Sequence, residues 1–274
     1  MNKAPIGQIG VGLIGSVIAS RLCAASYRVV GYDPSFSQLD GVEMASSASE
    51  VFSKCEMIVL SLPDSEVVRS VMAEVESVLD AGHLIINTTT GDAESVYTQM
   101  IEATIGGSSA LLADGEAVLF LGGDGGLIQR AQPILDALSS RCFHLGEVGM
   151  GARFKLVHNM AIGLNRAVVA ETLQFADALG FVSNQVLEIL LQSPAASAAM
   201  KAKGAKMVAA DYEPPQARLA QHLKDVRLML NAAKDVSAKT PLTKVHEELL
   251  ERAEALGYGD ADNAAVVEAY RERK

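Results

Sequence analysis

Apolar and polar positions alternate along the first half of the chain in a way that predicts strands separated by helices. The stretch 6–25 passes from an apolar strand through a glycine-rich turn into a helix. Short apolar runs predict further strands at 27–33, 55–63, 83–90 and 117–123, and residues 65–79 place apolar side chains near helical spacing. Strands that alternate with helices predict parallel pairing in a doubly wound sheet.

The second half of the chain has a different pattern, which is helical throughout. Apolar residues recur at helical spacing over 154–171, 171–191, 217–236 and 241–257, and a short tail helix follows. The change falls near residues 149–151. We therefore predict two domains, an α/β domain at 1–149 and an all-α domain at 150–274 that begins with a long interdomain helix.

Composition and charge exclude several classes of function. The 274 residues carry a net charge of −10 without an evident basic patch, which argues against nucleic-acid binding. No stretch approaches the roughly 20 apolar residues of a membrane span, and the N-terminus lacks the pattern of a signal peptide. A cytoplasmic protein that binds neither membranes nor nucleic acids is the expectation.

Cysteine and histidine spacing gives no sign of a disulfide framework or a metal site. Cys23, Cys55 and Cys142 are odd in number and far apart, without a CxxC pair, and the five histidines include no HExxH. We expect free thiols, as in a reducing compartment, and no bound metal.

The run "GVGLIG" carries the clearest chemical signal in the first domain. It comprises Gly10, Val11, Gly12, Leu13, Ile14 and Gly15, follows a predicted strand and opens a helix. Asp33 closes the next strand, at the distance typical of the acid that binds a ribose hydroxyl. These features predict an N-terminal Rossmann-type sheet that binds a dinucleotide phosphate at the helix N-terminus. No Arg or Lys directly follows Asp33 to bind a 2′-phosphate, so we expect NAD rather than NADP.

A lysine near the start of an almost wholly apolar helix needs an explanation. In "FKLVHNMAIGLNRAVVAE" (154–171), Lys155 and Asn159 project from one face because they are four residues apart, and Arg166 extends that stripe. One explanation is structural: the lysine stem lies on apolar surface while its ammonium reaches water. A proton-transfer group is the alternative, because burial lowers the pKa of a lysine from its usual value near 10.4 towards neutrality.

Several ordered blocks make the chain resemble the β-hydroxyacid dehydrogenase family, which includes 3-hydroxyisobutyrate dehydrogenase and tartronate semialdehyde reductase. They are "IGVGLIG", "LSLPDSEVV", "NTTTGDAE", "GMGARFKLVHN", "HLKDVRLML", "PLT" and "GDADNAAVVEAY", and they span nearly the whole chain. The resemblance implies hydride transfer between a nicotinamide dinucleotide and the hydroxyl carbon of a small β-hydroxyacid, or reduction of the matching semialdehyde.

The same resemblance implies roles for individual residues. Lys155 would be the general acid/base and Asn159 would bind the reacting part of the substrate. The cofactor contacts would include Leu62, Pro63, Thr90 and Lys224. A small carboxylate substrate would be held by the glycine loop that contains Gly106, Gly107 and Ser108.

The chain departs from the family pattern around that loop. The family carries "DAPVSGG", whereas this chain has "EATIGGS", so Glu102 replaces the Asp and the serine is displaced. Asn87 replaces the Asp that begins the threonine block. The crossover between Thr90 and Glu102 is shorter than a strand–helix–strand crossover usually is, which implies a differently shaped substrate pocket.

The sequence leaves two alternative functions open, and it also predicts a homo-oligomer. An enzyme of the same architecture could reduce another C=O or C=N bond, as imine reductases do, although these usually lack the helix lysine. A cofactor-binding protein without turnover is the second alternative. 6-Phosphogluconate dehydrogenase is disfavoured by the short chain and by Asp33. The long apolar helix predicts a homodimer or homotetramer formed by the helical half.

Overall fold

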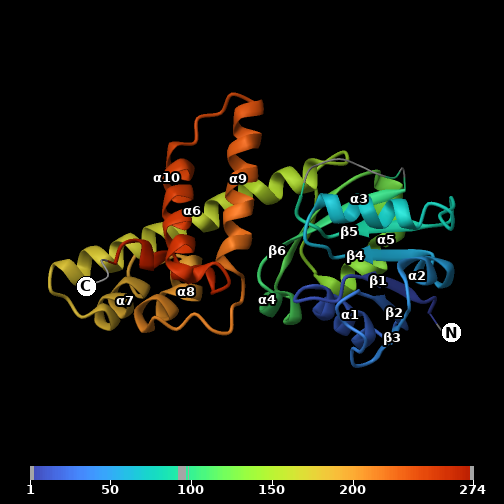
Figure 1. The fold of residues 1–274 in the computed structure, drawn as a ribbon, viewed down its shortest axis with the longest axis horizontal. Helices are drawn as coiled ribbons and strands as arrows, with labels where there is room; N and C mark the ends of the chain where they lie inside the picture. Colours follow the sequence, from blue (N-terminus) through green and yellow to red (C-terminus); the bar gives the residue numbers. More distant parts are fainter. Residues whose placement is uncertain (1–2, 92–96, 98, 272–274) are drawn as a thin grey trace. The chain divides into compact units, whose positions relative to one another are not determined.

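The computed structural model describes residues 3–91, 97 and 99–271, which fall into two compact units, residues 1–155 and residues 156–274. The first unit is an α/β layer structure and the second is helical (Figure 1). The predicted fold class is confirmed. The division falls inside the long helix α6 (Met150–Ala178), rather than at its start, where the sequence placed the domain boundary.

The first unit contains one eight-stranded sheet. Its strands are β1 (Ile6–Ile9), β2 (Val29–Tyr32), β3 (Val42–Met44), β4 (Met57–Leu60), β5 (Leu84–Asn87), β6 (Met100–Gly106), β7 (Val118–Gly122) and β8 (Cys142–His144). Their order in the sheet is β3-β2-β1-β4-β5-β6-β7-β8. The order reverses between β1 and β4, and ligands of such sheets bind beyond the carboxyl ends of the strands at this point.

One pairing corrects the prediction of a fully parallel sheet, because β7 runs antiparallel to β6. The connection between them, residues 107–117, contains only the five-residue helix α4 (Ser109–Ala113). A parallel return needs a crossover of a dozen residues or more. The other ladders, including β7 with β8, are parallel.

Helices cover both faces of the sheet because the strands are apolar on both sides. On one face, α1 (Gly15–Ala24), α4 and α5 (Gly125–Leu138) pack against side chains such as Ile6 and Val59. On the other face, α2 (Ala48–Lys54) and α3 (Ser65–Glu74) pack against the alternate residues, such as Ile58 and Ile85. The shortened crossover expected between Thr90 and Glu102 falls largely on residues 92–96 and 98, outside the described residues.

The second unit packs its helices around one apolar core. It contains most of α6, then α7 (Ser183–Leu191), α8 (Ala198–Ala209), α9 (Leu219–Asp235) and α10 (Pro241–Ala253), followed by the short helices η1 (Glu254–Tyr258) and η2 (Asn263–Ala269). Val169, Leu173, Leu223, Leu250 and Val266 belong to this core. In the described part of the chain, no helix has both the length and the apolar character that a membrane span requires.

Two histidines form a buried pair inside this helical core. The Nε2 atoms of His222 on α9 and His246 on α10 lie 3.0 Å apart, and both side chains are buried. A Cβ atom added to Gly163 on α6 would lie 2.7 Å from Nε2 of His222 and 3.1 Å from that of His246, so the glycine admits the pair. Burial, and to a smaller extent the charge of Arg166, lowers the pKa of His246 to about 4.

This histidine pair makes stability depend on pH in a defined direction. The unfolded chain binds a proton at His246 near pH 6.5, whereas the folded chain resists it until about pH 4, so stability is lost as the pH falls through that window. The loss approaches roughly 3 kcal/mol near pH 4. Urea unfolding at pH values across the window, compared with His246→Gln, measures the effect. An equally steep pH dependence in that variant would assign it to other groups.

Candidate functional site

The glycine turn after β1 has the shape that a dinucleotide pyrophosphate requires. Gly10 has a φ of +84°, and a Cβ atom there would lie 2.3 Å from the Ser61 carbonyl oxygen. A Cβ on Gly15 would lie 1.9 Å from the Gly10 carbonyl oxygen, so α1 can start only with a glycine at this position. A Cβ on Gly12 would meet nothing within 4 Å, which leaves the backbone open to a ligand.

The start of α1 adds an electrostatic reason for an anion to bind there. The helix begins at Gly15, and its N-cap Ile14 provides no side-chain hydrogen bond to the free N–H groups. Such N–H groups and the positive end of the helix dipole together bind phosphate. The residues predicted for this turn therefore fit a dinucleotide phosphate.

Asp33 lies beside this turn, at the end of β2. One carboxylate oxygen accepts a hydrogen bond from the Val11 backbone N–H at 2.9 Å, and the other accepts one from the Ser35 N–H at 2.8 Å. The two bonds fix the carboxylate at the carboxyl edge of the sheet. Each oxygen keeps further lone pairs that can accept a hydroxyl proton.

The ends of β4 and β5 lie next to each other at the same edge. The Leu62 N–H, after β4, donates to Thr89 Oγ1 at 3.1 Å, and the Thr89 N–H donates to Asn87 Oδ1 at 3.0 Å. The Asn87 amide oxygen thus accepts the hydrogen bond that closes this turn, and the Asp that the family carries at this position could accept the same bond. Leu62, Pro63 and Thr90 lie in these two segments, and their contact with a cofactor stays a prediction.

The lysine singled out in the sequence is buried in the structure. The Lys155 side chain is 7% exposed, and its Nζ donates a hydrogen bond to the backbone carbonyl of Ile105 on β6. The solvent-reaching lysine that the local pattern also allowed is therefore wrong. A buried ammonium has lost much of the hydration that favours its charged form. In general, burial of this kind is what allows a lysine to serve as an acid or a base near neutral pH.

Asn159 follows Lys155 by one turn of α6 and is held by a buried acid. Its Nδ2 donates to Asp225 Oδ2 on α9 at 3.0 Å, and its Oδ1 lies 3.2 Å from His158 Nδ1. Asp225 directly follows Lys224 in the block "HLKDVRLML", but it was not predicted as a site residue. Its neighbour Lys224 also lies on α9, with Nζ 4.0 Å from Asp225 Oδ1, and its predicted cofactor contact stays a prediction.

The predicted carboxylate loop combines one unusual backbone conformation with a helix cap. Gly107 has a φ of +143°, which L side chains rarely adopt. The Ser108 hydroxyl accepts a bond from the Leu111 N–H at 3.3 Å and so caps α4. A capping hydroxyl still has its own proton to donate, so Gly106, Gly107 and Ser108 remain candidates for substrate binding.

Comparison with known proteins identifies the family. Residues 5–146 match the model of the NAD binding domain of 6-phosphogluconate dehydrogenase, and residues 149–270 match that of NADP-dependent 3-hydroxyisobutyrate dehydrogenase. Glyoxylate/succinic semialdehyde reductase 1 of Arabidopsis thaliana is 30% identical over 97% of this chain and 98% of its own length. The chain belongs to the 3-hydroxyisobutyrate dehydrogenase family. The predicted resemblance is confirmed, and this dehydrogenase is an NAD(P)-dependent oxidoreductase that transfers hydride from small hydroxyacids or to the matching semialdehydes.

Solved structures show the same fold at lower identity. A 3-hydroxyisobutyrate dehydrogenase from Salmonella typhimurium matches this dehydrogenase with a TM-score of 0.89 at 22% identity, over 97% of this chain and 99% of the other. The cytokine-like nuclear factor N-PAC of Homo sapiens is a sequence relative of a different kind. It is 29% identical over 97% of this chain, which spans 51% of that protein.

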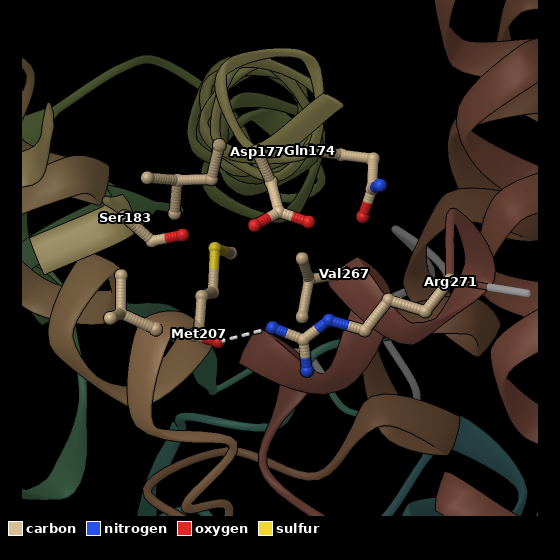
Figure 2. A pocket seen from close by; sticks show the side chains of 8 residues that line it. Gln174, Asp177, Ser183, Met207, Val267 and Arg271 are labelled. Atoms are coloured by element: carbon tan, nitrogen blue, oxygen red, sulfur yellow. Dashed lines mark hydrogen bonds between the residues drawn. The ribbon is translucent and has the colours of Figure 1, made fainter. Parts of the chain in front are cut away.

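A small pocket in the helical unit plays no evident part in hydride transfer. Figure 2 shows the Asp177 and Arg271 side chains facing its interior, with Arg271 donating a hydrogen bond to the Met207 carbonyl at 3.0 Å. Its volume of about 70 Å³ holds roughly two water molecules and is far too small for a dinucleotide. Among the described residues of the dehydrogenase, no cluster of three or more His, Cys, Asp or Glu side chains could hold a metal.

Proposed function

We propose that the protein interconverts a small β-hydroxyacid and the matching semialdehyde with NAD, and that Lys155 is the proton-transfer group. The observation that carries this proposal is the buried Lys155 amine, one turn from an asparagine that a buried carboxylate holds. The relatives named as glyoxylate/succinic semialdehyde reductases support the substrate class.

The proposed reaction follows from the chemistry of these groups. NAD, held by the glycine turn after β1 and by Asp33, would supply the hydride acceptor for the carbinol carbon. The Lys155 amine takes the hydroxyl proton, which leaves a carbonyl group, and in reduction the ammonium returns that proton to the developing alkoxide. The Asn159 amide supplies a hydrogen bond to the same oxygen. Gly106, Gly107 and Ser108 hold the carboxylate through N–H groups and a hydroxyl.

A substrate panel tests this function. The enzyme with NAD is offered 3-hydroxyisobutyrate, glycerate, serine, threonate and 3-hydroxypropionate, and NADH formation is followed by absorbance. Turnover with at least one of these acids, and none with an alcohol of equal length that lacks the carboxylate, is expected. Reduction of cyclic imines without turnover of any acid would favour the imine-reductase alternative, and cofactor binding without any turnover would favour the binding-protein alternative.

The preference for NAD over NADP rests on Asp33, whose charge repels a 2′-phosphate. Asp33→Asn keeps an oxygen that can accept the Val11 N–H bond but removes the charge. We expect the ratio of kcat/KM for NADP to that for NAD to rise by about tenfold or more, equivalent to roughly 1.4 kcal/mol. Steady-state kinetics with each cofactor measure the ratio. An unchanged ratio would show that Asp33 does not select the cofactor.

An exposed apolar face on the helical unit supports a homodimer. Val168 and Phe175 are seven residues apart on α6 and lie on one stripe, and the chain continues with Leu179, Phe181 and Val182, each of the five about 60–65% exposed. Together they expose on the order of 500 Å² of side-chain surface, which is large for a monomer and a substantial part of the roughly 800 Å² that each partner of a stable complex buries. We propose that a second copy of this chain covers this face.

Phe175→Glu tests the dimer. Light scattering should give a dimer or tetramer mass for the wild type and a monomer mass for the variant, because an unpaired carboxylate would be buried at the interface. Val236→Glu, at a still more exposed apolar residue after α9, is the matched control and should leave the mass unchanged. A monomer mass for the wild type would contradict the proposal.

We also propose a cytoplasmic location, which the free Cys23, Cys55 and Cys142 support.

A further inference from the structure

Strand β6 contacts the start of α6 at three successive levels. Glu102 Oε2 accepts hydrogen bonds from the Gly149 N–H at 2.8 Å and from the Ala152 N–H at 3.4 Å. Farther along β6, Thr104 Oγ1 donates to the Gly151 carbonyl at 3.1 Å, and the Ile105 carbonyl accepts the bond from Lys155. All of these residues belong to the first unit. Strand β6 therefore bonds both to the start of α6 and to the Lys155 amine.

Glycines on both sides make room for the Glu102 carboxylate. A Cβ atom on Gly122 would lie 2.4 Å from Glu102 Oε2, and a Cβ on Gly151 would lie 3.2 Å from it and 2.7 Å from the Phe120 carbonyl oxygen. An alanine at either position would displace the carboxylate or the helix. Glu102 itself is 5% exposed, so the contact is enclosed on all sides.

The carboxylate lies where the helix presents positive charge. The first N–H groups of a helix have no partners within it, and the helix dipole adds about half a positive charge at this end. Burial raises the pKa of Glu102, while bonds from the Gly149, Ala152 and Gly151 N–H groups and the charge of Arg153 oppose that rise. Lys155 follows Ala152 by three residues, about 4.5 Å along the helix axis.

We propose that Glu102 is a positioning residue for proton transfer: it fixes the start of α6 against β6 and so holds the Lys155 amine at the Ile105 carbonyl. The inference rests on the proposed function of Lys155. Misplacing a proton-transfer group by about 1 Å can cost a hundredfold in rate. We also expect the Glu102 charge to favour the protonated form of Lys155, so that the amine loses its proton at a higher pH than it would without Glu102.

Two substitutions separate the reach of Glu102 from its charge. Glu102→Asp keeps the charge but is one methylene shorter, so we expect kcat to fall by about ten- to a hundredfold with the KM for NAD unchanged. Glu102→Gln keeps the length and an acceptor for the Gly149 N–H but lacks the charge. We expect its kcat/KM for alcohol oxidation to rise at a lower pH than in the wild type, by roughly half to one pH unit. Thr104→Val, which removes the hydroxyl bonds to the Gly151 and Phe120 carbonyls but no charge, is the matched control and leaves that pH unchanged.

The pH at which Lys155 loses its proton can also be measured without turnover. The intact folded protein is acetylated with acetic anhydride at a series of pH values and then digested. Mass spectrometry of the peptide that contains Lys155 should show the same shift to lower pH in Glu102→Gln. Thermal unfolding identifies any variant that does not fold, and the glutamine variant, which keeps the size of the side chain, then decides the question.

The outcomes distinguish this inference from the function on which it rests. An inactive Lys155→Ala variant with unshifted acetylation in Glu102→Gln, and a wild-type kcat in Glu102→Asp, would overturn the role of Glu102 alone. Turnover by Lys155→Ala would overturn the proposed function itself. A lowered kcat in the aspartate variant, together with the acid shift in the glutamine variant, would support the inference.

Discussion

Lys155→Ala is expected to lower turnover by about three orders of magnitude while the affinity for NAD stays within a fewfold of the wild type. General acid–base groups contribute about a hundred- to ten-thousandfold, and the alanine removes the amine that is proposed to take the hydroxyl proton. The proposed NAD site consists of the turn after β1 and Asp33, which accepts the Val11 N–H bond, whereas Lys155 bonds to the Ile105 carbonyl on β6.

Steady-state kinetics and fluorescence titration with NADH measure the two properties of this variant. Lys201→Ala, at an exposed lysine of α8, is the matched control and should keep wild-type turnover. Loss of NADH binding together with turnover in Lys155→Ala would indicate a structural role for the lysine. Near-normal turnover would show that another group transfers the proton.

Asp262→Ala is expected to destabilise the helical unit by about 3–5 kcal/mol, the usual cost of removing one partner of a buried ion pair. Asp262 is fully buried and accepts bonds at 2.8 Å from Lys203 Nζ and at 2.8 and 3.0 Å from the N–H groups of Gln216 and Ala264. The variant leaves the buried Lys203 ammonium without its counter-ion. Arg166, whose buried Nε and Nη1 have no hydrogen-bond partner, adds a second positive charge nearby.

Urea unfolding followed by circular dichroism measures this loss. Asp262→Asn, which keeps the side-chain volume and one acceptor oxygen but removes the charge, should lose less than the alanine variant. Glu116→Ala, which removes an exposed ion pair with Arg141, is the control and should have a far smaller effect. A difference between Asp262→Ala and the wild type no larger than that control would contradict a structural role for the pair.

Local patterns were sufficient to predict the elements that carry a periodic signal. The strands that became β1, β2, β4, β5 and β7 were predicted from short apolar runs, and the glycine turn followed from its spacing. The long helix was predicted over 154–171 and extends over Met150–Ala178. Its end differs because the chain stays helical through the expected start of the next helix at Glu171 and breaks only near Gly180, whose φ is +86°.

Elements with polar residues in buried positions could not be predicted in this way. β6 is buried along its whole length, yet Glu102 and Thr104 interrupt its apolar pattern, and the sequence analysis predicted only the glycine loop at 106–108 and no strand before it. Their partners are backbone groups of α6, almost 50 residues away in the sequence, and no local pattern reveals such contacts. Asp225 was missed for the same reason, because Asn159 lies 66 residues from it.

The central claim is that the Lys155 amine exchanges the substrate's hydroxyl proton during hydride transfer. Chemical rescue of Lys155→Ala tests it most directly, with turnover measured as a small primary amine such as ethylamine is added. The account predicts a rate close to zero without amine that rises with the concentration of the free amine. A rate that does not respond to the amine, at a level comparable to the wild type, would contradict it.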